Sequence, residues 1–170
     1  MVLKFSLTGE GIIRHAQATD VRLLEWHGGI DLRSFYEACW QAHQSGNSTL
    51  LVADLNGFPI GQVVIIWSGK ASHPHFPDLQ SLRVHSAFRG MGVGTKLLHA
   101  AEVTVASRGF SQAGLSVGLE NPHAQRLYQR LGYHPTGAVY DDHWSYINAN
   151  GQEVPQVERV IDLVKELTAQ

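Results

Sequence analysis

Short apolar runs rich in β-branched residues recur along the chain and alternate with amphipathic segments. We predict strands at residues 12–15, 49–54, 60–67, 79–84, 114–119, 133–140 and 158–167. Asn56-Gly57 lies between the second and third of these runs and is a hairpin signal. The last segment alternates poorly, so a helix is the alternative there.

Between these runs the apolar positions follow a helical period. We predict helices at residues 19–27, 32–44, 92–107 and 122–131. Thr19 and Asp20 are expected to cap the first helix, and Asp31 precedes the second. The third helix places five apolar residues on one face, namely Val93, Leu97, Leu98, Ala101 and Val105. Strands that alternate with helices indicate an α/β or α+β fold with a strand-to-helix crossover in the middle.

Two polar segments, 68–78 and 148–156, are rich in loop-forming residues. Neither is long enough to separate domains, so we expect residues 1–170 to form one domain. Residues 1–11 lack the apolar core and cleavage site of a signal peptide. No run approaches the ~20 apolar residues of a membrane helix. We therefore expect a soluble, cytoplasmic protein.

The glycine-rich turn at residues 89–95, RGMGVGT, joins a predicted strand to a predicted helix. The first amides of a helix lack internal acceptors and carry partial positive charge. Glycines allow a ligand to approach this backbone closely, and Arg89 adds charge. The turn is therefore typical of a phosphate or pyrophosphate site. A turn that only packs the helix onto the sheet is the alternative.

Two common phosphate motifs do not match this turn. A P-loop needs Gly-Lys-Ser/Thr, but Thr95 separates Gly94 from Lys96. The dinucleotide fingerprint needs G-x-G-x-x-G, whereas the spacing here is G-x-G-x-G. Segment 112–119 also lacks the acidic residue expected ~20 positions on. These differences disfavour a nucleotide-binding oxidoreductase.

A second motif, GLSVGLENPHAQRLYQRLGY, spans residues 114–133. Asn121 is a good helix N-cap, Pro122 suits the first helical position, and Gly132 ends the helix. One helical face carries the apolar residues Ala124, Leu127, Tyr128 and Leu131. Local signals thus predict a strand, a capped helix and a glycine stop.

Together the two motifs resemble the signatures of the GNAT (Gcn5-related N-acetyltransferase) superfamily. R-G-M-G-V-G resembles the Q/R-x-x-G-x-G/A turn, and Leu82 and Val84 match the strand before it. The second signature matches in register from Leu115 to Tyr133, with Asn121 and Tyr128 at its asparagine and tyrosine. Both lie in the family's order and separation, and this conjunction is more specific than either motif alone. The resemblance implies a mixed, mostly antiparallel central sheet of about six to seven strands, about four helices and splayed central strands.

The resemblance also implies acetyl-CoA as cosubstrate and direct transfer of the acetyl group to an amine acceptor. The turn would hold the pyrophosphate, strand 79–84 would pair with the pantetheine arm, and Tyr128 would protonate the departing thiolate. The residues that it assigns to coenzyme binding are Leu82, Arg83, Val84, Arg89, Gly90, Met91, Gly92, Val93, Gly94, Thr95, Asn121 and Ala124. A homodimer is compatible with it.

The general base is the open part of this chemistry. An alkylamine has a pKa of ~10.4 and must lose a proton before it attacks a thioester. Many relatives that acetylate protein amino termini carry glutamate where this chain has Ser116, which has no comparable basicity. A water chain remains a candidate, as do five side chains: Asp78, Glu120, His73, His75 and His143. The missing carboxylate keeps a non-catalytic acyl-CoA-binding module of the same fold as the alternative function.

Charge and cysteine content narrow the partners. Thirteen Lys and Arg minus fifteen Asp and Glu give a net charge of −2, with ten histidines counted as neutral. We therefore expect no nucleic-acid or anionic-membrane partner. The single cysteine, Cys39, cannot form an intramolecular disulfide and is predicted to be a buried small hydrophobe.

Two further clusters leave their roles open. His73-Pro74-His75 is a histidine pair without a further cluster at metal spacing, so no metal is expected. Another set follows the last predicted helix and comprises Asp141, Asp142, Trp144 and Tyr146. It is compatible with a solvated strand end and equally with an acceptor-site wall that attracts a cationic amine.

Overall fold

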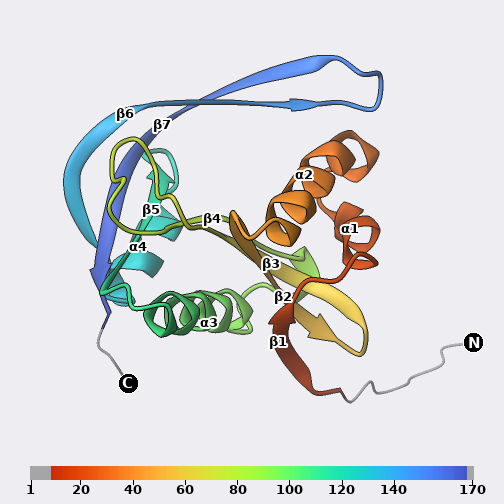
Figure 1. Ribbon diagram of the computed structural model, residues 1–170, viewed down its shortest axis with the longest axis horizontal. Coiled ribbons are helices and arrows are strands. Elements are labelled where there is room, and N and C mark those ends of the chain that lie inside the picture. The colour runs from red at the N-terminus through yellow and green to blue at the C-terminus, as the bar shows by residue number, and fades with distance from the viewer. Residues whose placement is uncertain (1–8, 168–170) are drawn as a thin grey trace, which may run out of the picture.

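The computed structural model describes residues 9–167, and within this range seven strands form one sheet in the order β1-β2-β3-β4-β5-β7-β6 (Figure 1). The strands are β1 (Gly11–His15), β2 (Ser48–Leu55), β3 (Phe58–Ile66), β4 (Asp78–Val84), β5 (Gln112–Gly118), β6 (His134–Ile147) and β7 (Glu153–Glu166). The helices are α1 (Asp20–Leu23), α2 (Arg33–Gln44), α3 (Val93–Ser107) and α4 (Pro122–Arg130). The expected α/β (α+β) fold with a mixed, mostly antiparallel sheet is confirmed. Most of the segment for which we expect no signal peptide, residues 1–8, lies outside the described residues.

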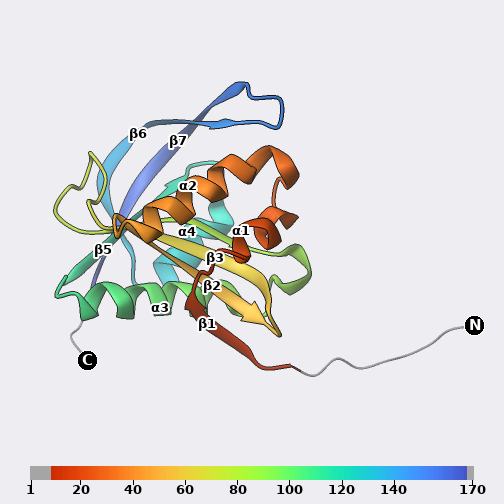
Figure 2. The same ribbon diagram turned by 45° about the vertical axis from the view of Figure 1, so that its right-hand side comes forward.

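The helices cover the sheet on two faces with different apolar clusters. Helices α1 and α2 lie on one face and α3 on the other (Figures 1 and 2). The larger cluster includes Leu97, Leu98 and Tyr133, and partly buried residues of α4 pack against it. The smaller cluster packs Leu24 and Tyr36 against Val64 of β3. We call these the α3 face and the α2 face.

Strands β4 and β5 are parallel neighbours, and the pairing between them in the described chain is a single pair, Asp78 with Gly114. Beyond this apex the strands diverge, so the β5-facing edge of β4 from Gln80 to Val84 has no strand partner. A bulge distorts β4 at the same place, because the register against β3 shifts between Gln62 and Val64. Ser81 lies at this bulge with a φ of 52°, in the left-handed region. The expected splay of the central strands is thus present.

Strands β6 and β7 form a long hairpin that arches away from the sheet toward α2 (Figure 1). Its turn contacts the segment before α2 and the first turn of α2. The Ser34 hydroxyl donates to the Ile147 carbonyl at 2.6 Å, and the Ala149 amide donates to Asp31 at 3.1 Å. The hairpin is therefore tied at its turn to α2 and to the segment before it.

Several predicted boundaries were wrong. Residues 19–27 form only a short α-helix followed by a 3₁₀ turn at Leu24–Trp26, and Thr19 makes no side-chain cap bond. Instead, Asp20 is buried and bonds to Arg14. The last two strands extend to Ile147 and back to Glu153, so residues 153–156 of the predicted loop 148–156 are strand. Much of this hairpin is exposed on both faces, so its sequence lacks the alternation that marks a half-buried strand.

Candidate active site

The glycine-rich turn lies where β4 leads into α3. Gly90 and Gly92 have φ values of 77° and 80°, which a residue with a side chain rarely adopts. A Cβ at either position would meet no atom within 4 Å, so open space surrounds this backbone. The Arg89 Nε donates to the Val84 carbonyl at 3.1 Å, which fixes the arginine at the end of β4. The first amides of α3, a helix of fifteen residues, therefore face an open and positively charged position.

Helix α4 returns the chain from the open end of the β4–β5 gap to its apex. It follows Gly118, and β6 begins at His134, which pairs with Val164 opposite Gly114. Asn121 caps the helix by accepting a hydrogen bond from the Ala124 amide at 3.1 Å, as predicted. The outer side of α4 carries a groove of about 450 Å³ with a basic lining of His123, Arg126, Gln129 and Arg130.

Tyr128 lies on the inner side of α4, partly buried against the larger apolar cluster. Its ring meets that of Tyr133 edge-on, with centroids 6.0 Å apart. Burial raises the pKa of the Tyr128 hydroxyl, which is therefore protonated at neutral pH. No residue between 9 and 167 hydrogen-bonds to this hydroxyl, so its proton is available to a ligand.

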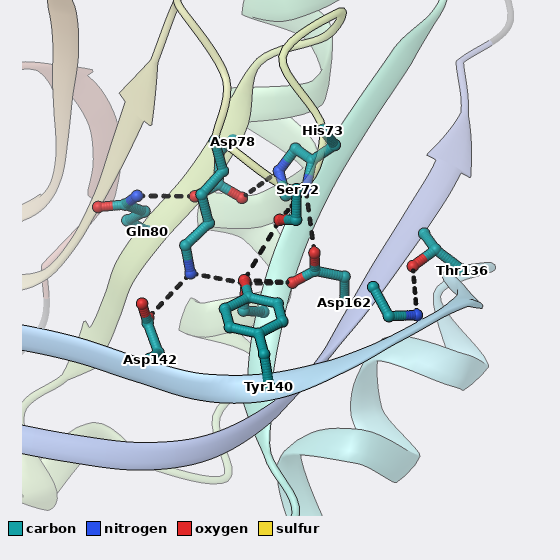
Figure 3. Close-up of polar contacts among 11 residues, drawn as sticks. Ser72, His73, Asp78, Gln80, Thr136, Tyr140, Asp142 and Asp162 are labelled. Carbon is teal, nitrogen blue, oxygen red and sulfur yellow. Dashed lines mark hydrogen bonds and ion pairs between the residues drawn. The ribbon is translucent and has the colours of Figure 1, made fainter.

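A cluster of polar side chains occupies the α2 face at the apex of the gap (Figure 3). Ser116, on β5, donates to the Oδ1 atom of Asp162 at 2.6 Å, and Tyr140 donates to the same atom at 2.8 Å. Lys70 bonds to the Ser116 hydroxyl at 3.0 Å and to Asp142 at 2.8 Å, with its ammonium 5.3 Å from the centre of the Tyr140 ring. Burial would raise the pKa of Asp162, but the hydrogen bond from Ser116 and those of its other donors lower it.

His73 joins the loop at 68–78 to both sides of the apex. Its Nε2 atom lies 2.8 Å from Asp78 on β4, and its Nδ1 atom lies 3.3 Å from Asp162 on β7 (Figure 3). Burial alone would lower the pKa of His73, but Asp78 and then Asp162 outweigh burial and raise it. We call this arrangement the histidine clasp. Gly114 makes room for it, since a Cβ there would lie 2.9 Å from His73 and 2.6 Å from Phe76.

The structure separates the candidate bases into two groups. His73 and Asp78 are buried in the clasp and bonded to each other. His75, Glu120 and His143 are exposed and lie outside the polar cluster. Asp162 was not among the residues that the sequence pointed to. A lone aspartate inside the apolar run at residues 160–164 does indicate a buried carboxylate that needs partners.

The acidic and aromatic set on β6 is divided in the same way. Asp142 reaches the polar cluster, whereas Asp141 is exposed and paired with Arg159 at 3.0 Å. Trp144 is also exposed and lies beside Tyr146. The set therefore contributes one carboxylate to the apex rather than a continuous wall.

The residues expected to bind coenzyme fall on two faces of the gap. Leu82, Val84 and Val93 pack toward the larger cluster, and Met91 is exposed in the turn. The Arg83 side chain lies on the α2 face, where its charge influences the pKa values of His27 and Tyr36. The backbone of Arg83, and not its side chain, can therefore line the β4–β5 gap.

Two other expectations concern metals and membranes. Within residues 9–167 no group of three or more His, Cys, Asp and Glu side chains could hold a metal ion. In the same range no helix is long and apolar enough to cross a bilayer. Cys39 is partly buried against the smaller cluster, and burial raises its pKa to about 11, as expected for a residue that packs as a hydrophobe.

Comparison with known proteins places these features in context. A model of the acetyltransferase (GNAT) family matches residues 16–133, which include both motifs. An uncharacterized N-acetyltransferase of Methanocaldococcus jannaschii is 33% identical over 84 residues, which are 48% of this chain and 37% of that protein. The match thus spans little more than a third of that relative.

Solved structures share the fold at low sequence identity. An N-acetyltransferase from Staphylococcus aureus Mu50 superposes with a TM-score of 0.68 at 13% identity, over 94% of this chain and 99% of that one. A Salmonella typhimurium protein solved with its cofactor acetyl-CoA gives a TM-score of 0.67 at 19% identity, over 94% and 95% of the two chains.

The histidine clasp predicts a pH-dependent stability. Because its pKa is raised in the folded state, His73 contributes to the unfolding free energy at low pH. This contribution is fully present below the ordinary pKa of 6.5 and is lost as pH rises through the folded-state pKa. We expect the difference in unfolding free energy between wild type and His73→Gln to be larger at about pH 6 than at about pH 9, as measured by urea unfolding.

His43→Gln is a matched control. Burial lowers the pKa of His43, so its contribution to the unfolding free energy is lost as pH falls. The difference in unfolding free energy between wild type and His43→Gln should therefore be larger at high pH. Equal differences at both pH values for His73→Gln would contradict a charged clasp.

Proposed function

The chain belongs to the acetyltransferase (GNAT) family, and from this we propose that it transfers the acetyl group of acetyl-CoA to a primary amine of a small molecule or peptide. The observation that supports this proposal best is the divergence of β4 and β5 beside the open turn at Gly90–Thr95. The divergence offers a free strand edge, and the turn offers free helix amides. A long ligand with a pyrophosphate and an amide-containing arm needs both.

In this proposal the coenzyme lies along β4. Amides of residues 90–95 bind the pyrophosphate, with Arg89 adding positive charge. Unpaired backbone groups from Gln80 to Val84 bind the amides of the pantetheine arm, as an added strand would. Asn121 and Ala124 border the same gap from the start of α4.

The bulge and Tyr128 then act on the thioester. A backbone amide at the bulge around Ser81–Leu82 donates to the carbonyl oxygen as negative charge develops on it. The acceptor nitrogen attacks the carbonyl carbon, the carbon–sulfur bond breaks, and the Tyr128 hydroxyl protonates the leaving thiolate. Transfer is direct, without an acetylated enzyme intermediate.

The proton of the acceptor amine leaves through water. Ser116 cannot act as a base, and Asp162 is held anionic by several donors, which makes it a weak base. His73 has both ring nitrogens directed at carboxylates and no lone pair free. A water chain from the α2 face to solvent is therefore the route in this proposal.

Gly92→Asp tests the pyrophosphate site. Acetyl-CoA at ~100-fold its dissociation constant should stabilise the wild type by roughly 2.7 kcal/mol, seen as a higher melting temperature. An aspartate at Gly92 places a side chain and negative charge against the helix amides, so most of this shift should disappear. Gly109→Asp, at the other end of α3, has the same left-handed strain and the same open surroundings, and it should keep the shift. A full shift in folded Gly92→Asp would rule out the turn.

Tyr128→Phe tests the acid. Phenylalanine keeps the ring against the core but removes the hydroxyl, and general acids typically contribute 10²–10⁴-fold. Single-turnover acetylation of an amine found by a panel screen should slow by roughly that range, with acetyl-CoA affinity little changed. The wild-type rate should rise with pH in proportion to the neutral fraction of the acceptor amine, so its midpoint should match the pKa of that amine.

Tyr133→Phe is the control for Tyr128→Phe. It removes a hydroxyl bonded to Glu102 rather than one open to a ligand, and it should leave the chemical step intact. A chemical step within about threefold of wild type in Tyr128→Phe would exclude the acid role. Failure of every amine to release coenzyme A, despite binding of acetyl-CoA, would favour the binding-module alternative.

A further inference from the structure

Gln62 is a buried polar residue without partners. It lies on β3 with 1% of its surface exposed, and neither its Nε2 nor its Oε1 atom has a hydrogen-bond partner among residues 9–167. Its strand neighbours Val63 and Ile65 belong to the larger cluster, whereas Val64 and Ile66 contact the smaller one. Strand alternation therefore directs Gln62 to the α2 face. A buried amide that is left unpaired is uncommon and suggests a ligand that completes it.

Arg83 lies beside Gln62. The two residues pair across β3 and β4, so their side chains share the α2 face. Arg83 is half-buried and forms no hydrogen bond or ion pair with any described residue. Other arginines of the chain do have carboxylate partners: Arg14 with Asp20, Arg33 with Glu25, and Arg159 with Asp141.

Among residues 9–167 no carboxylate forms an ion pair with Arg83, whose charge instead acts on His27 and Tyr36. Burial lowers the pKa of His27, and the charges of Arg83 and Arg89 lower it further. Burial raises the pKa of Tyr36 to about 12, and the nearby charge of Arg83 opposes that rise. His27 follows the 3₁₀ turn at Leu24–Trp26, and Tyr36 lies on α2, with its hydroxyl bonded to the His27 carbonyl at 3.2 Å. Gln62 and Arg83 thus lie beneath the segment between α1 and α2, in a region of positive charge.

At the apex end of the same face Asp142 of β6 is paired with Lys70, and Glu158 of β7 lies against Gly118 at the other end of β5. Arg83 follows the bulge residue Ser81 by two positions, or about 7 Å along a strand that rises ~3.3 Å per residue. A small molecule whose amine reaches the bulge can therefore place a carboxylate within reach of the Arg83 guanidinium.

We propose that Gln62 and Arg83 form a subsite for the carboxylate of the acceptor, which makes the acceptor a small amino acid–like molecule rather than a simple amine. Arg83 binds the carboxylate with its paired N–H groups, and Gln62 Nε2 donates a further hydrogen bond. Gln62 Oε1 accepts from an N–H of the same molecule. This inference rests on the proposed acetyl transfer, but carboxylate binding can be measured without it.

The first experiment compares matched acceptors. The twenty common amino acids are assayed against the amines formed by their decarboxylation, with acetyl-CoA and detection of the released thiol. For the preferred pair, kcat/KM should be at least tenfold higher for the carboxylated member. Arg83→Gln should lower kcat/KM for the amino acid by about 10–100-fold and change kcat/KM for the decarboxylated amine by less than about threefold. Arg83→Lys keeps the charge but loses the paired N–H groups, so its kcat/KM for the amino acid should lie between those of wild type and Arg83→Gln.

Arg22→Gln serves as the matched control, because Arg22 is an arginine of α1 with an exposed side chain. It should leave the preference unchanged. Equal use of both members of every pair by wild type would overturn the carboxylate subsite while leaving acetyl transfer intact. An unchanged preference in Arg83→Gln would overturn it as well.

The second experiment does not depend on activity. Gln62→Met keeps the volume but removes the unpaired amide, so the variant without ligand should melt higher than wild type by roughly 2–4 °C. Calorimetry with the preferred amino acid should show at least tenfold weaker binding to Gln62→Met. Binding of that amino acid without any acetylation would support the subsite and reject the proposed function. A lower melting temperature with unchanged binding would show that Gln62 is structural and would overturn the inference.

Discussion

Strands β4 and β5 run parallel but pair only at Asp78 and Gly114 among the described residues, and the rest of the site depends on that apex. A parallel pair that continued would consume the backbone groups of β4 in strand pairing. Because the strands part, those groups remain free along the edge that a ligand can join. The histidine clasp fixes the apex by placing one imidazole between carboxylates on β4 and β7. Its contribution is electrostatic and buried, so it resists screening by salt better than a surface ion pair would.

The divergence also gives the gap two chemically different sides. On the α3 face the walls are apolar, and the Tyr128 hydroxyl there has no hydrogen-bond partner among residues 9–167. On the α2 face the apex carries Ser116, Asp162, Tyr140 and Lys70, with Arg83 and Gln62 farther along the sheet. A coenzyme and an acceptor can therefore reach the same point from opposite sides. The β6–β7 hairpin is held at its turn by α2 and by the segment before it.

The apex holds a carboxylate although position 116 is a serine. The Ser116 hydroxyl bonds directly to Asp162 on the neighbouring strand. The negative charge is present but stabilised by several donors. It suits the positioning of hydroxyl groups and cations better than the removal of a proton.

Much of the fold was predictable because its signals are local. Asn121, Pro122 and Gly132 mark the bounds of α4 within a few residues, and the glycines at 90–94 mark the turn before α3. The parts that could not be predicted depend on register between distant strands. Ser116 meets Asp162 across 46 positions of sequence, and the environment of Arg83 follows from its pairing with Gln62. The assignment of Thr19 as a cap was wrong because its own backbone is helical, with φ of −66° and ψ of −27°. Asp20 is bound by Arg14, a tertiary contact that no local pattern contains.

Amide hydrogen exchange with and without acetyl-CoA reports which backbone groups the coenzyme covers. We expect slower exchange in two segments, residues 81–84 at the free edge of β4 and residues 90–96 at the start of α3. Exchange in β1 and β2 should not change. Protection that avoids both segments, in a sample that acetyl-CoA stabilises against heat, would contradict the placement of the coenzyme in the β4–β5 gap.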